Sequence, residues 1–326
     1  MYVQTTKYVF IVGAVITVTL FATVYFPPRD TTRESLVVST TTSLYDTGLL
    51  DVLEDHFEKS SDLDLNFISA GTGLAMKHAQ GGDADVILVH APSKEFAFME
   101  EGYGVVRKIV AYNFFAIVGP VEDPARIGDL PPKDALKKIA DAGRNREVLW
   151  VSRGDDSGTH TKEKSLWKAS GLDPIAMSEE GWYIESGTGM GKALQIAHER
   201  RAYILADVGT YLKYLQEGVI DLLVLVDEGK ELLNVYSVLA VNPQTRPEIF
   251  FDGAITFIKY LVSDEGQNII GGYGIDRYGQ SLFFPAVVLL EKEVDPKLVE
   301  WIKEFSYFNG SECPLKYRMG HDELYN

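Results

Sequence analysis

The sequence has a single cysteine and far fewer basic than acidic residues, and each shortage excludes a class of protein. With Cys313 alone, neither a disulfide framework nor a zinc site of the CxxC type can form. Lysine and arginine number 31 against 47 aspartates and glutamates, a formal net charge of −16. Because nucleic acids bind to clustered cations, this excess of acid argues against a nucleic-acid partner. Any bound anion must be held by local dipoles, against the field of the whole protein.

What is present is enough apolar sequence for a folded protein. The 326 residues are 46% hydrophobic and 24% charged, as in ordinary globular proteins. Single cores stop growing at about 250–300 residues, so we expect about two domains.

The N-terminus carries a long apolar run. Residues 8–26 have no charged side chain, follow Lys7 and end at Pro27-Pro28. The run is long enough to span a bilayer as a helix. Because no small-x-small cleavage site and no lipid-accepting cysteine follow it, we interpret residues 1–34 as a membrane anchor and linker. A signal peptide that is removed is the alternative.

The rest of the chain alternates between two kinds of segment. Apolar, strand-like runs that lead into helical segments lie at 36–39, 63–69, 84–91, 147–152 and 181–186. In the first helical segment, Leu49, Leu50, Leu53 and Phe57 share one helical face. This alternation predicts an α/β fold with mainly parallel strands.

Two long extended runs, at 108–119 and 232–243, stand apart from this alternation. We interpret them as strands that cross between two lobes joined by a hinge. Lobe 1 would then comprise 35–111 plus 236–326, and lobe 2 would comprise 112–235. The alternative is two ordinary strands in contiguous domains.

Four loops share one design, in which a strand leads through Ser, Thr and Gly residues into a helix. They lie at 39–43, 69–73, 152–159 and 185–191. Unpaired N–H groups and the helix dipole attract anions at such positions. Any single loop is more simply a helix cap, but four in one chain favour a binding cleft between the lobes.

Arg153 makes an anion site more specific. Its planar guanidinium lies in sequence beside Ser157, Gly158 and Thr159, which suits a compact tetrahedral oxyanion. The alternative is a structural ion pair with Asp155 or Asp156.

The acidic residues of this loop bear on which oxyanion binds. Phosphate carries a proton at neutral pH and needs a carboxylate acceptor, whereas sulfate, molybdate and tungstate need only donors. The strand 84–91 ends at His90 without an acid, and we expect Asp155 and Asp156 to point away and cap the helix. His90 is either a donor near the ligand or a structural hydrogen-bonding group.

Signals for catalysis are weak. The six histidines are scattered, and His160 with Glu163 is a poor metal-ligand pair. Gly187-x-Gly189-x-Gly191 resembles part of a dinucleotide fingerprint but lacks its acidic partner. We therefore expect no enzyme and no cofactor.

The motifs together also resemble a known family, the TupA-type tungstate-binding proteins of ABC transporters. The resemblance spans about 36–290 and rests on the segments TTTSLYDTGLLDVL, SAGTGLAMKHAQGGDADVILVHAP, EEGYGVVRKIVAYNFFAIVGP, SRGDDSGTHTKE and YGQSLFFP. It implies a type II periplasmic-binding-protein fold, with two α/β lobes, two hinge strands and an oxyanion enclosed between the lobes. It also implies an extracytoplasmic location, with delivery of the ligand to a membrane permease driven by an ATPase.

The resemblance further implies which residues contact the oxyanion. They are Thr41, Thr42, Ser43, Gly71, Thr72, Arg153, Ser157, Gly158, Thr159, Gly187 and Thr188. One departure is Val208, where an arginine is expected in the family, which puts the local charge compensation in doubt.

Residues and resemblance together predict a receptor anchored to the membrane through 8–26. Its ligand is expected to be tungstate, with molybdate as a weaker one. The first alternative is a phosphate or sulfate receptor of the same fold. The second is an anchored enzyme acting on phosphate or sulfate esters, which would need a base within reach of Ser43 or Ser157.

Overall fold

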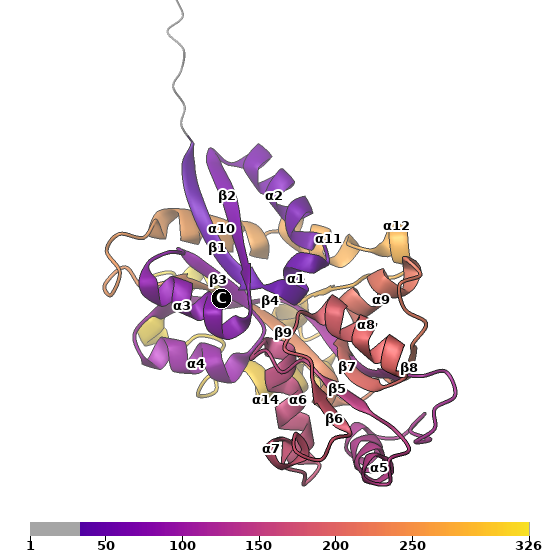
Figure 1. Cartoon of the computed structure of the whole chain (residues 1–326). Coiled ribbons are helices and arrows are strands. Elements are labelled where there is room, and N and C mark those ends of the chain that lie inside the picture. Colours follow the sequence, from indigo (N-terminus) through magenta and orange to yellow (C-terminus); the bar gives the residue numbers. More distant parts are fainter. Residues whose placement is uncertain (1–32, 326) are drawn as a thin grey trace, which may run out of the picture. The chain divides into compact units, whose positions relative to one another are not determined.

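A ten-stranded sheet organises residues 33–325, the part of the chain that the computed structural model describes (Figure 1). The strands are β1 (Glu34–Thr41), β2 (Leu63–Ala70), β3 (Val86–Val89), β4 (Gly104–Gly119), β5 (Trp150–Ser152), β6 (Tyr183–Glu185), β7 (Tyr203–Asp207), β8 (Leu223–Val226), β9 (Leu233–Val241) and β10 (Phe284–Pro285). The helices are α1 (Thr42–Asp46), α2 (Leu49–Ser60), α3 (Thr72–Gly81), α4 (Pro92–Glu100), α5 (Pro132–Arg144), α6 (Gly158–Ala169), α7 (Pro174–Met177), α8 (Met190–Arg200), α9 (Val208–Gln216), α10 (Phe251–Val262), α11 (Asp264–Gly272), α12 (Ile275–Tyr278), α13 (Val287–Lys292) and α14 (Pro296–Ser306).

The strand order is β2-β1-β3-β9-β4-β7-β5-β6, with β8 and β10 also paired to β4. We call β2, β1, β3, β9, β10 and the start of β4 the first half-sheet. The end of β4 with β7, β8, β5 and β6 forms the second half-sheet. Strand β1 is parallel to β2 and β3, and β5 is parallel to β6 and β7. The predicted α/β fold is confirmed. The expectation of mainly parallel strands is wrong, because β9 pairs antiparallel with β3 and β4, and β7, β8 and β10 pair antiparallel with β4.

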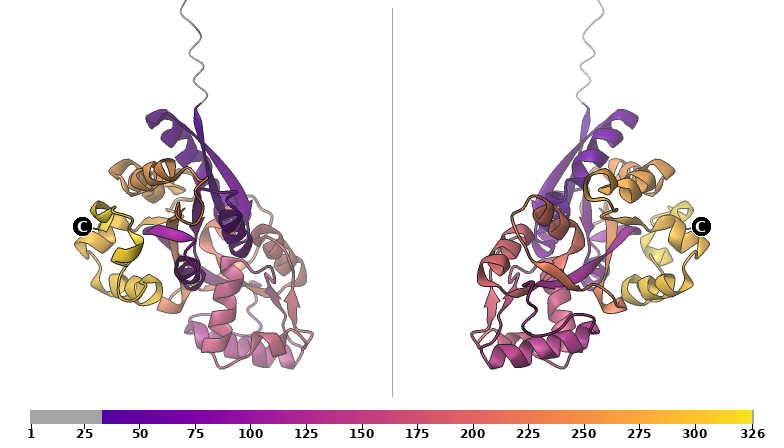
Figure 2. Two further views of the ribbon diagram at one scale, coloured as in Figure 1. Left: turned by 90° about the vertical axis from the view of Figure 1, so that its left-hand side faces the viewer. Right: turned by 90° about the vertical axis from the view of Figure 1, so that its right-hand side faces the viewer.

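Helices cover both faces of each half-sheet (Figures 1 and 2). Successive residues of a strand point to opposite faces, so each strand contributes to one core on each face. In β3, Val86 and Leu88 pack with α2 and α10, whereas Ile87 and Val89 pack with α3 and α4. In the second half-sheet, Ile117 of β4 faces α5 and α6, and its neighbours in sequence face α8 and α9. A strand buried on both faces must be apolar throughout, which explains the continuous apolar runs in the sequence.

Helix α2 shows how well helical periodicity determines packing. Leu49, Leu50, Leu53 and Phe57 are its buried residues, and all four belong to the core of the first half-sheet. Their spacing places them on one side of the helix, so the predicted apolar face is confirmed.

Strands β4 and β9 join the two half-sheets. They correspond to the two extended runs and pair antiparallel, with Ala111 opposite Tyr236. These two residues are the positions at which the predicted lobes begin and end. Residues 33–325 nevertheless pack as one unit, so the division into 35–111 plus 236–326 and 112–235 stays a prediction.

The proposed anchor, residues 8–26, lies outside the described residues. Within 33–325 the structure has no helix that combines the length and the apolar character needed to cross a bilayer.

A buried ion pair joins the strands of the first half-sheet to the segment that follows His90. The Arg107 guanidinium lies 2.8 Å from Glu95, and neither side chain is exposed. Arg107 also donates to Ser237 Oγ of β9 at 2.8 Å and to the carbonyl of Glu312 at 3.0 Å. The second oxygen of Glu95 accepts the N–H of Ala91 at 2.8 Å. This network therefore fixes the backbone directly after His90.

We expect Arg107→Met to destabilise the protein because it leaves the Glu95 carboxyl buried without its cation. The free energy of unfolding, measured in urea, should fall by about 3–5 kcal/mol. Lys59→Met is the matched control, since it breaks an exposed pair with Asp55, and it should cost less than about 1 kcal/mol. Equal losses in the two variants would contradict a stabilising role for the buried pair.

Candidate functional site

The four predicted loops all connect a strand to a helix. They lead from β1 to α1, from β2 to α3, from β5 to α6 and from β6 to α8. Two of the loops provide a side-chain cap for the following helix, since Thr41 Oγ1 accepts the N–H of Leu44 and Ser157 Oγ accepts that of His160. Gly71 and Gly189 are the N-cap residues of α3 and α8, and they provide no side-chain cap. Capping therefore accounts for two hydroxyls and leaves the others unexplained.

The loops meet although they are far apart in the sequence. Arg153 Nη2 lies 3.4 Å from Thr42 Oγ1, and Arg153 Nε donates to the carbonyl of Thr188 at 2.9 Å. A Cβ atom on Gly71 would lie 3.5 Å from the carbonyl oxygen of Asp155. Helix α1 also contacts α8 from the other half-sheet (Figure 1). Loops of both half-sheets thus meet at one place, where Arg153 contacts the loops 39–43 and 185–191 in addition to its own.

The Arg153 guanidinium is fully buried. Its Nε donates to Asp155 Oδ2 at 3.1 Å, and its Nη2 also pairs with that oxygen. Its Nη1 has no partner. Since a guanidinium carries five N–H donors in one plane, Asp155 holds one edge and both N–H groups of Nη1 stay available.

Two threonines have equally unpaired side chains. Within residues 33–325, the buried side-chain polar atoms without a hydrogen-bond partner are Thr72 Oγ1, Arg153 Nη1, Thr159 Oγ1 and the hydroxyls of Tyr260 and Tyr278. Three of these five atoms belong to predicted site residues. Leaving such a group unpaired in the interior costs about 1–3 kcal/mol. Three unpaired donors in converging loops fit a ligand that accepts hydrogen bonds.

The expectation that Asp155 points away from the site is wrong. Its Oδ2 faces Arg153, and its Oδ1 accepts the N–H of Ser157 at 3.3 Å. The alternative of an ion pair between Arg153 and Asp155 is confirmed. The physical reason is that a fully buried guanidinium requires a carboxylate partner.

Asp156 does not cap the helix either. Its side chain is exposed and pairs with Lys94 Nζ of α4 at 2.9 Å. The pair links the two half-sheets beside the site. No sequence motif indicated this pair, because Lys94 lies 62 residues away.

The remaining predicted residues occupy different environments. Gly158 is buried against His90, and a Cβ atom on it would lie 2.7 Å from the imidazole. Gly187 is exposed, with a φ of 62° that favours glycine. Thr188 contributes its carbonyl to Arg153, and its hydroxyl lies 3.3 Å from Ser186 Oγ. Gly154 is not among the predicted site residues, but it has a φ of 62° and approaches Glu185 and the backbone of Gly187.

His90 takes the structural role that was one of its two interpretations, yet it lies beside the site. Its Nδ1 is 2.9 Å from Asn234 Oδ1, and its Nε2 is 3.3 Å from Ser43 Oγ. Burial lowers the pKa of His90 to about 4; the hydrogen bond to Asn234 opposes this, and the charge of Arg153 adds to it. His90 is therefore neutral at physiological pH.

Glu163, which the sequence pairs with His160 as a candidate metal ligand, is part of the core. The Glu163 carboxylate accepts hydrogen bonds from Trp150, Ser152, Trp167 and Tyr183. This network fixes β5 directly before Arg153. In the described part of the chain, no three His, Cys, Asp or Glu side chains are grouped as metal ligands.

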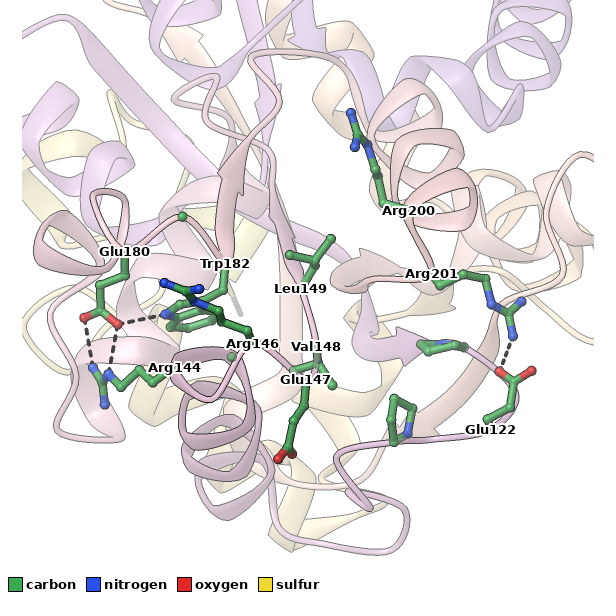
Figure 3. A pocket seen from close by; sticks show the side chains of 14 residues that line it. Glu122, Arg144, Arg146, Glu147, Val148, Leu149, Glu180, Trp182, Arg200 and Arg201 are labelled. Atoms are coloured by element: carbon green, nitrogen blue, oxygen red, sulfur yellow. Dashed lines mark hydrogen bonds and ion pairs between the residues drawn. The ribbon is translucent and has the colours of Figure 1, made fainter.

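A cavity of about 890 Å³ lies elsewhere, beside the residues that precede β5 and β6 (Figure 3). Four arginines line it, but Arg144 is paired with Glu180 and Arg201 with Glu122. None of the predicted site residues reaches it. Its arginines are exposed, so it lacks the buried unpaired donors of the loops around Arg153.

The chain is similar to proteins of a known family. Residues 27–265 match the family model of the PBP superfamily domain. The tungstate-binding protein TupA of Peptoclostridium acidaminophilum is 40% identical over 256 residues, which is 78% of this chain and 86% of the relative.

Two solved structures are similar as well. The tungstate-binding protein TupA from Desulfovibrio alaskensis has a TM-score of 0.66 and 39% identity, covering 77% of this chain and 98% of that one. The tungstate ABC transporter structure from Geobacter sulfurreducens has a TM-score of 0.66 and 44% identity, covering 74% and 99%.

The contact between Gly158 and His90 can be tested without a ligand. We expect Gly158→Ala to lower the free energy of unfolding by about 1–3 kcal/mol, because the added methyl group overlaps a buried ring held by Asn234. Gly272→Ala is the control, since a Cβ atom there meets nothing within 4 Å. It should be neutral or stabilising by up to about 1 kcal/mol. Urea denaturation measures both, and an unaffected Gly158→Ala variant would argue against this close approach of α6 to His90.

Proposed function

The chain belongs to the PBP superfamily and, within it, to the TupA tungstate-binding proteins, and on this basis we propose that it is the substrate-binding protein of an ABC transporter. It captures tungstate, and molybdate more weakly, in the loops around Arg153. It then delivers the anion to a membrane permease driven by an ATPase. The protein binds its ligand without transforming it.

The observation that carries this proposal is the set of three buried donors without partners. Arg153 Nη1, Thr72 Oγ1 and Thr159 Oγ1 offer hydrogen bonds that nothing in the described chain accepts. A fully deprotonated tetrahedral oxyanion only accepts hydrogen bonds, so it complements this set. The N-termini of α3, α6 and α8 add N–H groups and favourable dipoles.

The ligand's charge is balanced mainly by dipoles. Asp155 already neutralises Arg153, so a dianion gains its stabilisation from oriented N–H and O–H groups. Donors of this kind act strongly in a site from which water is excluded. The proposal thus agrees with the need, inferred from the net charge of −16, to hold an anion by local groups.

Val208 does not leave an uncompensated charge beside it. The preceding residue, Asp207, is fully buried, and both its oxygens accept hydrogen bonds from Thr210. Burial raises the pKa of the Asp207 carboxyl, and these hydrogen bonds and the nearby Arg153 charge oppose that rise. Compensation near Val208 therefore comes from Thr210 and Arg153.

A phosphate receptor is the second candidate, because Asp155 faces the site. A carboxylate there could accept the proton of hydrogen phosphate. Asp155 Oδ2 already accepts two hydrogen bonds from Arg153, and Oδ1 accepts the N–H of Ser157, so a single lone pair of Oδ1 is left for that proton. We favour an anion that needs no proton acceptor, because the relatives at 40% and 39% identity are tungstate-binding proteins.

An anchored esterase would use Ser43 as its nucleophile and His90 as its base. The two are within hydrogen-bond reach, and Asn234 orients the imidazole. Taking the proton of the serine converts the neutral imidazole into an imidazolium, which a carboxylate stabilises in serine hydrolases. Here the orienting group is a neutral amide, and burial holds the pKa of His90 near 4. The arrangement disfavours the imidazolium and hence catalysis.

We further propose that residues 8–26, which lie outside the described residues, anchor the protein to the membrane. Strand β1 begins at Glu34, so a short linker would hold the receptor close to its permease on the extracytoplasmic side.

Calorimetric titration of the purified protein with tungstate, molybdate, sulfate and phosphate tests the proposed ligand. We expect tungstate to bind most tightly and molybdate more weakly. Phosphate and sulfate should bind far more weakly than either. Phosphate bound as tightly as tungstate would favour the second candidate and overturn our choice.

Arg153→Ala should abolish tight binding of tungstate. The variant loses two charge-assisted N–H donors worth about 1.5–3 kcal/mol each, which corresponds to a loss in affinity of about 10²–10⁴-fold. Arg146→Ala is the matched control, since it removes an arginine from the cavity of Figure 3 and should leave the affinity unchanged. Circular dichroism and thermal melting verify that both variants fold. Wild-type affinity in a folded Arg153→Ala variant would refute the role of this residue.

A further inference from the structure

A continuous chain of buried hydrogen bonds runs from the first loop of the site to the strands that join the half-sheets. It passes through Thr41, Ser43, His90, Asn234 and Asn113, each of which is no more than 4% exposed. We call these five residues the hydrogen-bond chain. The distances between successive side chains are 3.4, 3.3, 2.9 and 2.9 Å. Two backbone groups, one at each end, complete it.

The end at the strands fixes the direction of the hydrogen bonds. Asn113 Nδ2 donates to the carbonyl of Leu282 at 3.3 Å, and a carbonyl can only accept. Asn113 Oδ1 therefore accepts, and Asn234 Nδ2 donates to it. The same Nδ2 donates to the hydroxyl of Tyr236 at 2.9 Å. Asn234 Oδ1 is consequently the atom that faces His90.

This direction determines the tautomer of His90. Because Asn234 Oδ1 can only accept, Nδ1 of the neutral imidazole carries the proton and Nε2 carries a lone pair. The lone pair accepts a hydrogen bond from the hydroxyl of Ser43. The charges of Arg153 and Lys162 and the burial of the ring all favour neutral His90. The rings of Phe115 and Tyr236 pack near it.

The end at the loop agrees with this direction. The N–H of Leu44 donates to Thr41 Oγ1 at 3.3 Å, and because the single hydroxyl proton of Ser43 goes to His90, Thr41 is the donor in its hydrogen bond with Ser43 Oγ. An N–H group cannot accept, and a carbonyl cannot donate. The chain of hydrogen bonds therefore has one direction over its whole length.

We propose that the hydrogen-bond chain commits the hydroxyl protons of Thr41 and Ser43 to the protein interior, so that in this loop only Thr42 donates its hydroxyl to the oxyanion. His90 is the positioning residue that enforces this polarity. The inference rests on the proposed function, since it specifies which of the predicted residues act as donors.

The surroundings of Thr42 agree with that assignment. Its Oγ1 faces Arg153 Nη2 at 3.4 Å and accepts from it, which leaves its own proton free. The remaining lone pair of Ser43 Oγ would repel an oxygen of a deprotonated anion. The loop thus discriminates by the direction of its protons as well as by its shape.

The hydrogen-bond chain also connects the loop to both joining strands. Asn113 and Asn234 lie directly opposite each other on β4 and β9. A change in the pairing of these strands would move Asn234 relative to His90 and so alter the orientation of Ser43.

The tautomer is measurable on the wild-type protein without any ligand. In protein labelled with ¹⁵N in its histidine side chains, we expect the His90 spectrum to show protonated Nδ1 and unprotonated Nε2 throughout pH 5–8. Comparison with His90→Gln identifies the signal. A protonated Nε2 would overturn the proposal, whether or not tungstate is the ligand.

Titration of variants with tungstate tests the consequence for binding. Thr42→Val should lose about 10- to 100-fold in affinity, because a donor to a charged acceptor is removed. Ser43→Ala should lose clearly less affinity than Thr42→Val once its folding is confirmed, since its proton goes to His90 and does not reach the anion. Equal losses in the two variants would contradict the proposal. If the wild-type protein bound no tungstate, the proposed function would fail, but the tautomer measurement would still test the hydrogen-bond chain. If Ser43→Ala did not fold, the tautomer measurement would test the direction of the hydrogen bonds in its place.

Discussion

The burial of the Arg153 guanidinium is the constraint on which the site depends. A buried cation is tolerated only where a carboxylate and further acceptors surround it. These acceptors are Asp155, the carbonyl of Thr188 and the hydroxyl of Thr42, and Thr42 directly follows β1 of the first half-sheet. The hydrogen bonds of Arg153 therefore hold the loops of both half-sheets together, while its Nη1 remains available for a ligand.

The framework makes this convergence possible. In parallel sheets the carboxyl ends of neighbouring strands lie at one edge, and the following helices begin there. Strands β1 and β2 place two loops at such an edge, and β5 and β6 place two more. The antiparallel pair of β4 and β9 holds the half-sheets side by side. The buried networks around Glu95 and Glu163 fix the backbone next to His90 and Arg153.

The side chains of Ser43, His90 and Asn234 could serve either catalysis or ligand binding, and their surroundings determine which. Ser43, His90 and Asn234 have the order of a nucleophile, a base and an orienting group. A neutral amide and a dry environment keep the imidazole uncharged, so that it acts as a fixed acceptor. A group of this kind can set the direction of a hydroxyl in a binding site without ever accepting its proton. The neutral amide of Asn234, in place of a carboxylate, thus favours a binding site over a catalytic one.

The sequence by itself determined the α/β alternation, the apolar face of α2, the two joining strands and the four loops, because these follow from local periodicity and from Ser, Thr and Gly before helices. It also indicated Arg153 and its threonine neighbours. The orientation of Asp155 was predicted wrongly, and the pairing of Asp156 with Lys94 and the roles of Asn113 and Asn234 were missed. These depend on contacts between residues distant in the sequence. Only the tertiary structure decided them, because the burial of Arg153 and His90, which sets their partners and protonation, arises when the two half-sheets pack.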